Sequence, residues 1–100
     1  MIFEAQQYGS LLILRNSEGI EIGSLSIGDG EFLGHSRDFV VIRYQDMIVT
    51  MDSQQNVLGR LVIDSRYVVR SITEAGFTVK ADTAIETYDR YCNHINHYTV

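Results

Sequence analysis

The sequence has no proline and no tryptophan, and it has a single cysteine, Cys92. One cysteine cannot form an intramolecular disulfide, so this chain of 100 residues must rely on its hydrophobic core, which a domain of this size can supply. No apolar run approaches the roughly 18 residues of a membrane-spanning helix, and the first residues lack the basic and apolar regions of a signal peptide. We therefore expect one domain, residues 1–100, located in the cytoplasm and not in a membrane.

Positive charge is also scarce. Eight Lys and Arg residues stand against thirteen Asp and Glu residues, which gives a formal net charge of −5. A negative protein is repelled by phosphate backbones, so this balance disfavours general binding to nucleic acid. The hydrophobic share of 45% is typical of a packed globular domain.

Short apolar runs rich in Val, Ile, Tyr and Phe alternate with Gly, Asn, Asp and Ser, a pattern typical of an antiparallel β-meander. The connections are too short for the crossovers that parallel strands require. Asp29-Gly30 predicts a two-residue hairpin between the runs on either side. The predicted strands are Ile2–Gln7, Leu11–Arg15, Ile20–Ile27, Glu31–Leu33, Phe39–Tyr44, Met47–Met51, Val57–Ile63, Tyr67–Ile72 and Phe77–Ala81.

An internal repeat supports this interpretation. Residues 16–27 align without gaps with residues 52–63, 36 positions later, and each copy opens on Asn or Asp. Gly23 and Gly59 fall at the same place, where a strand-interior glycine usually marks a β-bulge or a close backbone approach. A bulge at Gly23 would also restore one buried face, because the apolar alternation changes there. We expect two twisted hairpins around one core.

The last segment has a different pattern. Its apolar residues recur at intervals of three and four, as one face of a helix requires, and Thr83 with Glu86 has the spacing of a capping box. We therefore predict a helix over residues 82–98. A third hairpin is the alternative, because Thr87-Tyr88-Asp89 lies 37 positions after Thr50-Met51-Asp52; the helix is preferred since this third copy lacks the strand glycine. The predicted fold class is thus mainly β (α+β): a curved antiparallel meander or small barrel of about eight strands over residues 1–81, with the C-terminal helix on its concave side.

Two stretches contain residue types suited to chemistry. His94 and His97 are three positions apart, but a zinc site needs three or four ligands in fixed geometry. Residues 34–38 hold a histidine, a serine, an arginine and a carboxylate in one short connection, yet catalytic triads are assembled in space and not by adjacency. We predict no catalytic residue, no metal site and no cofactor, and hence no enzyme.

Acidity without a catalytic constellation favours a small cytoplasmic protein-binding module, such as an inhibitor or immunity protein that masks a basic protein partner. In size and acidity the chain resembles small β-rich bacterial proteins that neutralise a toxin or an enzyme, although no motif is shared. The alternatives are a self-associating module that forms homo-oligomers and, after it, a small-molecule binder with a concave β site. The candidate partner-binding residues are Glu18, Glu21, Asp29, Glu31, His35 and Arg37.

Overall fold

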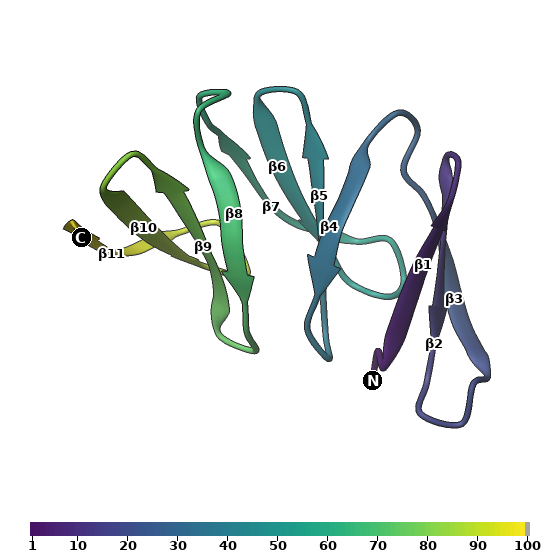
Figure 1. The fold of residues 1–100 in the computed structure, drawn as a ribbon. Coiled ribbons are helices and arrows are strands. Elements are labelled where there is room, and N and C mark those ends of the chain that lie inside the picture. Colours follow the sequence, from purple (N-terminus) through teal and green to yellow (C-terminus); the bar gives the residue numbers. More distant parts are fainter. Residues whose placement is uncertain (100) are drawn as a thin grey trace.

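The computed structural model describes residues 1–99, which form eleven strands and no helix (Figure 1). The strands make three antiparallel sheets, named A, B and C here, which stand in a row in a molecule of 41 × 25 × 19 Å. Within these residues there is accordingly no helix that is long and apolar enough to cross a membrane. Sheet A contains β1 (Glu4–Tyr8), β2 (Leu11–Arg15) and β3 (Glu21–Ser26); sheet B contains β4 (Glu31–His35), β5 (Val40–Tyr44), β6 (Met47–Met51) and β7 (Val57–Val62); sheet C contains β8 (Val68–Ile72), β9 (Gly76–Ala81), β10 (Ala84–Asp89) and β11 (His94–Thr99).

The three sheets are copies of one repeat. Strands β1, β2 and β3 recur 36 positions later as β5, β6 and β7. They recur again in sheet C as β9, β10 and β11, with the same pairing register after a shift of 37 positions. Each last strand has a β-bulge at the same place, opposite Leu14, Thr50 and Thr87. The predicted repeat is confirmed, and it has a third copy.

The same turn joins the last two strands of every repeat. The side-chain oxygen of Asn16, Asp52 or Asp89 accepts hydrogen bonds from the backbone N–H groups two and four residues later, at 2.9–3.0 Å. The residue three positions later has φ between 64° and 77° in each copy. Asn and Asp side chains stabilise such turns through hydrogen bonds to nearby backbone groups, so this residue starts the hairpin in each of the three repeats.

The predicted helix over residues 82–98 is wrong, because this segment forms β10 and β11. The alternative, a third hairpin opened by Asp89, is right. A turn follows Asp89 and a bulge follows at Ile95, and each displaces the apolar alternation by one residue, so that two strands imitate the spacing of a helix. The curved meander or barrel is wrong as well, because the strands divide into three separate sheets that do not close.

The predicted hairpin at Asp29-Gly30 is also wrong, since β3 and β4 belong to different sheets. The turn lies one residue earlier: Gly28 has φ +60°, and the Gly30 N–H donates to the Ile27 carbonyl at 3.0 Å. Gly30 itself packs against the Tyr44 ring, where a Cβ would lie 2.7 Å from ring carbons. This turn therefore carries the chain from one sheet to the next.

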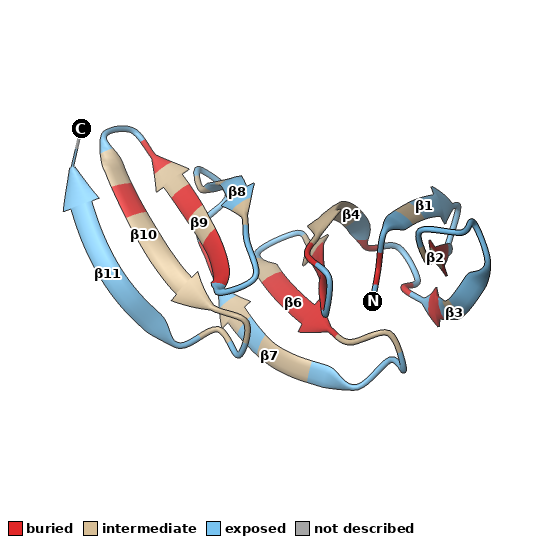
Figure 2. Cartoon of the chain, turned by 90° about the horizontal axis from the view of Figure 1, so that it is seen from below, coloured by how far each residue is buried: buried red, intermediate tan, exposed pale blue. Residues whose placement is uncertain are grey.

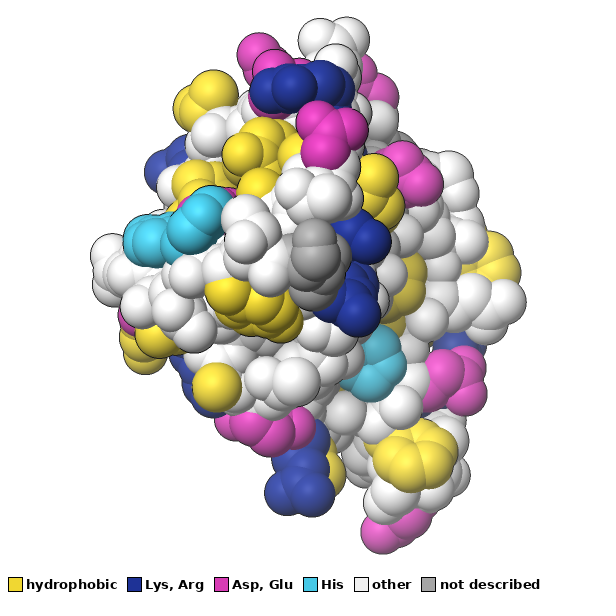
Figure 3. Space-filling model, turned by 60° about the vertical axis from the view of Figure 1, so that its left-hand side comes forward, with side chains coloured by type: hydrophobic (Ala, Val, Ile, Leu, Met, Phe, Trp, Pro, Cys, Tyr) yellow, Lys and Arg dark blue, Asp and Glu magenta, His cyan; other side chains and the backbone are white. Residues whose placement is uncertain are grey.

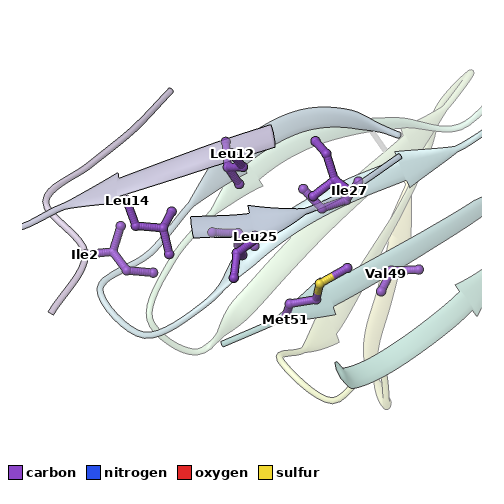
Figure 4. Close-up of a cluster of buried hydrophobic side chains, with 9 residues drawn as sticks. Ile2, Leu12, Leu14, Leu25, Ile27, Val49 and Met51 are labelled. Carbon is purple, nitrogen blue, oxygen red and sulfur yellow. The ribbon is translucent and has the colours of Figure 1, made fainter. Parts of the chain in front are cut away.

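Two hydrophobic cores lie between the three sheets, in place of the one core we expected (Figure 2). Figure 4 shows the core between sheets A and B. Successive side chains of a strand point to opposite faces, so sheet B buries one set of residues against sheet A and the other against sheet C. The core between A and B consists of Ile2, Leu12, Leu14, Leu25, Ile27, Val40, Ile42, Val49 and Met51. The core between B and C consists of Phe39, Val41, Ile48, Ile63, Phe77 and Val79.

The strand glycines hold neighbouring repeats in register. A Cβ on Gly23 would lie 2.6 Å from the Ser53 carbonyl oxygen in the turn of sheet B, and a Cβ on Gly59 would lie closer still to the Tyr91 carbonyl oxygen in the turn of sheet C. Each glycine thus marks both features that a strand-interior glycine predicts, a bulge and a close backbone approach. Asn96 takes the equivalent position in sheet C and is exposed.

Candidate functional site

The four acidic residues predicted to bind a partner do not form one surface. Glu18 lies in the turn between β2 and β3 and Glu21 begins β3, whereas Asp29 and Glu31 follow the other end of that strand. The six residues of β3 span roughly 17 Å at the usual rise per residue. All four side chains are exposed. The structure therefore divides the predicted set into two pairs at opposite ends of the sheets.

The side chains of His35 and Arg37 form contacts within the molecule. The His35 ring stacks on Phe32 with centroids 6.3 Å apart, and its Nδ1 lies 2.8 Å from the Ser36 carbonyl oxygen. Arg37 forms an ion pair with Glu74 at 3.6 Å, and its backbone N–H donates to the same carboxylate at 3.2 Å. The Ser36 hydroxyl accepts a hydrogen bond from the backbone of its own loop at 3.2 Å. This stretch thus connects the β4–β5 loop to the β8–β9 loop.

Arg90 completes the same connection from sheet C. Its guanidinium forms an ion pair with Asp38 at 3.6 Å and donates to the Glu74 carbonyl at 2.7 Å. It also lies over the Phe39 ring, 5.5 Å from the ring centroid, where a cation is attracted to the aromatic face. Three loops from sheets B and C are therefore joined at this end of the molecule, and their charges are largely engaged with one another.

The opposite end carries a row of exposed carboxylates that spans all three sheets. In a meander every second connection lies at the same end of the strands, so loops far apart in sequence come together there (Figure 1). We name this surface the aspartate edge. Two of its members, Asp64 and Asp82, share Arg66 at 3.4 and 3.7 Å. The Arg66 backbone N–H lowers the pKa of the Asp64 carboxyl. The members are Asp29, Glu31, Asp46, Asp64 and Asp82, all of them exposed.

Sequence reasoning selected two members of this edge, Asp29 and Glu31, and missed the other three. The signal that would have found Asp46, Asp64 and Asp82 is the alternation of the connections, because each follows a strand that runs in the same direction as β3. All three of these strands were among the predicted ranges, so the alternation alone would have grouped Asp46, Asp64 and Asp82 with Asp29.

His94 and His97 meet at one carboxylate. The bulge at Ile95 places both rings on the same side of β11, where the His94 Nε2 lies 2.8 Å from one oxygen of Glu86 and the His97 Nδ1 contacts the other. The hydrogen bond from His97, and after it that from His94, lowers the pKa of Glu86. Within residues 1–99 no group of three or more His, Cys, Asp or Glu side chains has an arrangement able to hold a metal ion. The cluster links β11 to β10.

Cys92 lies among the side chains of the core between sheets B and C. Burial raises the pKa of its thiol, which disfavours the reactive thiolate. Its sulfur is 3.9 Å from the Thr50 hydroxyl, which donates to the Arg90 carbonyl at 2.6 Å. This side chain fills space between two sheets, as a half-buried free cysteine commonly does.

The described residues contain no pocket, so the surfaces they offer are the loop ends, the strand edges and the outer faces of sheets A and C. Comparison of this chain with protein-family models, with curated protein sequences and with solved structures finds no match.

Proposed function

We propose that this protein is a cytoplasmic protein-binding module of the inhibitor or immunity type, which uses the aspartate edge to mask a basic protein partner. The observation that carries the proposal is the row of five exposed carboxylates along one end of all three sheets. Two arginines lie at this edge: Arg66 forms ion pairs with Asp64 and Asp82, and Arg43 donates to backbone carbonyls of the same loops. Five carboxylates against two guanidinium groups leave the edge with a net negative charge. Rows of like charge on a rigid scaffold accelerate encounter with an oppositely charged surface and orient it.

The opposite end is less suitable for this role. Two of its carboxylates are already paired within the molecule, Glu74 with Arg37 and Asp38 with Arg90. In this proposal, His35 and Arg37 therefore hold loops together and do not bind the partner. Glu18 and Glu21 remain exposed at that end, which makes them suitable control positions.

The test compares two charge-neutralised variants in affinity capture from the native lysate at low salt. The edge variant combines Asp29→Asn, Asp46→Asn, Asp64→Asn and Asp82→Asn. Asparagine keeps the side-chain oxygen that accepts the Arg66 N–H at position 64, and it tolerates the positive φ of 55° at position 82, so the turns are preserved. The control variant combines Glu18→Gln with Glu21→Gln.

We expect one stoichiometric basic partner on the wild type and on the control variant, released as salt screens the charges. The edge variant loses that partner while retaining the wild-type melting temperature within a few degrees. Equal retention by the edge variant, or loss in the control variant instead, refutes the assignment of the aspartate edge. A partner that resists salt refutes the electrostatic basis of the proposal.

A further inference from the structure

The outer strands of the three repeats differ in how their free edges are protected. In sheet A, the Gln55 side chain bonds both the N–H and the carbonyl of Ser26 in β3, at 3.3 and 3.0 Å. In sheet B, β7 carries the charged Arg60 at its centre. In sheet C, β11 has no Lys, Arg, Asp, Glu or Pro, and all six of its residues are exposed. Apart from the bulge at Ile95, which has equivalents in β3 and β7, this edge lacks such protection, and an edge of this kind is a template for pairing with another strand.

The same strand keeps apolar residues at positions that form an interface elsewhere in the molecule. Ile95 corresponds to Leu58 and Tyr98 to Leu61, because the pairing registers of β10–β11 and β6–β7 match. In sheet B these leucines pack into the core against sheet C. In sheet C, Ile95 and Tyr98 are 56% and 43% exposed. Figure 3 shows this end of the molecule, where hydrophobic and histidine side chains lie together at the surface.

A further stacked repeat does not fit this face. In sheets A and B the turn of the next repeat rests on Gly23 or Gly59, but the equivalent residue of sheet C is Asn96, whose Cβ occupies the space that the turn would need. In sheet B, Val40 and Ile42 pack against the preceding sheet. The equivalent residues of sheet A are Glu4 and Gln6. The end faces of two copies therefore cannot reproduce the internal packing, and pairing along the strand edge is the arrangement that remains.

We infer that β11 is a self-association surface, on which two copies of this chain pair antiparallel about a two-fold axis to form one eight-stranded sheet. Full overlap of His94–Thr99 with its copy places Ile95 opposite Tyr98 of the second copy, and Tyr98 opposite its Ile95. Two aromatic and β-branched pairs thus form across the axis, on the same face of the sheet. Because Ile95 and Asn96 form a bulge that shares one partner, Tyr98 lies opposite both of them. The remaining pairs are His94 with Thr99 and His97 with His97 of the second copy, so no carboxylate or Lys/Arg charge lies opposite another. Because one strand edge buries little area, the dimer is weak and concentration-dependent.

The test is sedimentation velocity of the wild type from about 10 µM to about 1 mM, a range that covers weak association. Ile95→Lys and Ile95→Glu disrupt the apolar pairs with charges of either sign, at an exposed bulge position. Val62→Lys is the matched control, because Val62 is 76% exposed on the outer strand β7 of sheet B. Thermal melting checks that each variant is folded.

We expect the wild type and Val62→Lys to shift from monomer to dimer across this range, and both Ile95 variants to remain monomeric. A wild type that stays monomeric at the highest concentration overturns the inference. So does a dimer that survives both Ile95 substitutions, or one that Val62→Lys abolishes equally. None of these results depends on the aspartate edge, which lies at the loops and not on β11.

Discussion

Substituting Gly59 by alanine tests the contact that holds sheet C on sheet B. The added Cβ would meet the Tyr91 carbonyl oxygen at less than the 2.6 Å found for the equivalent pair, Gly23 and Ser53. A carbon–oxygen contact needs about 3.3 Å, so the turn of sheet C must withdraw by more than roughly 0.7 Å. The backbone fixes the position of the Cβ, and the oxygen belongs to a peptide carbonyl, so no side-chain rotation relieves the clash.

The energetic cost arises because withdrawing the turn separates sheet C from sheet B. The distance between sheets B and C is set by the core that contains Phe39, Ile48 and Phe77, each at most 2% exposed. Forcing extra volume into such packing costs about 3 kcal/mol at the upper end of the usual range. Alanine recovers up to about 1 kcal/mol, because it loses less backbone entropy in a strand than glycine does. We therefore expect a net destabilisation of about 2 kcal/mol, or a fall in Tm of roughly 8–16 °C.

The measurement is thermal and urea unfolding of Gly59→Ala beside Asn96→Ala. Asn96 is the matched control, since it occupies the same position in sheet C with no turn packed on it. Its substitution should change the free energy of unfolding by no more than about 0.5 kcal/mol. If Gly59→Ala is as stable as the wild type, the close approach between the repeats is wrong, and with it the account of why this position is glycine.

Three further predictions concern the contacts of the third repeat. The Asn93 N–H lowers the pKa of Asp89; the ionised carboxylate therefore stabilises the fold above its unfolded pKa of about 3.9, and this contribution is lost as pH falls through the lower folded value. Urea unfolding of Asp89→Asn and the wild type should thus differ most at neutral pH and converge in acid, and a difference independent of pH contradicts this. Arg90→Met should cost about 1–2 kcal/mol in chemical unfolding, because it removes contacts to Asp38, Glu74 and Phe39; no change would show that these loops are held by packing alone. Thr50→Val should cost about 1–2 kcal/mol, because it leaves the Arg90 carbonyl without its donor, whereas Thr50→Ser keeps that donor and should cost less; a Thr50→Val variant as stable as the wild type would show that this hydrogen bond does not stabilise the fold.

Local patterns were sufficient for most of the strands. All nine predicted ranges overlap one strand each along most of its length, and the 36-residue echo identified the repeat, its turns and the bulged glycines. These features depend on interactions within a few residues: the Asn or Asp side chain that starts each turn, and the alternation of apolar residues along a strand. These features can therefore be predicted from the sequence.

The candidate site was only partly predictable. Asp29 and Glu31 were recognised as exposed acidic residues, but their separation from Glu18 and Glu21 depends on the direction and length of β3. The same is true of Arg37, whose partner Glu74 is 37 positions away in sequence. A surface is defined by which loops share an end of the sheet, and that follows from strand pairing.

What the sequence alone determined is the β character of residues 1–81, the repeat and the absence of a disulfide. Tertiary structure decided the secondary structure of residues 82–98. Their apolar spacing suits either a helix or a bulged hairpin, and pairing of β10 with the edge of β9 selects the hairpin. Tertiary structure also decided that three sheets stack around two cores, because sheet B is apolar on both faces and so requires a neighbour on each side. Local hydrogen bonds act over a few residues, whereas the burial of a whole face depends on which distant segment lies against it.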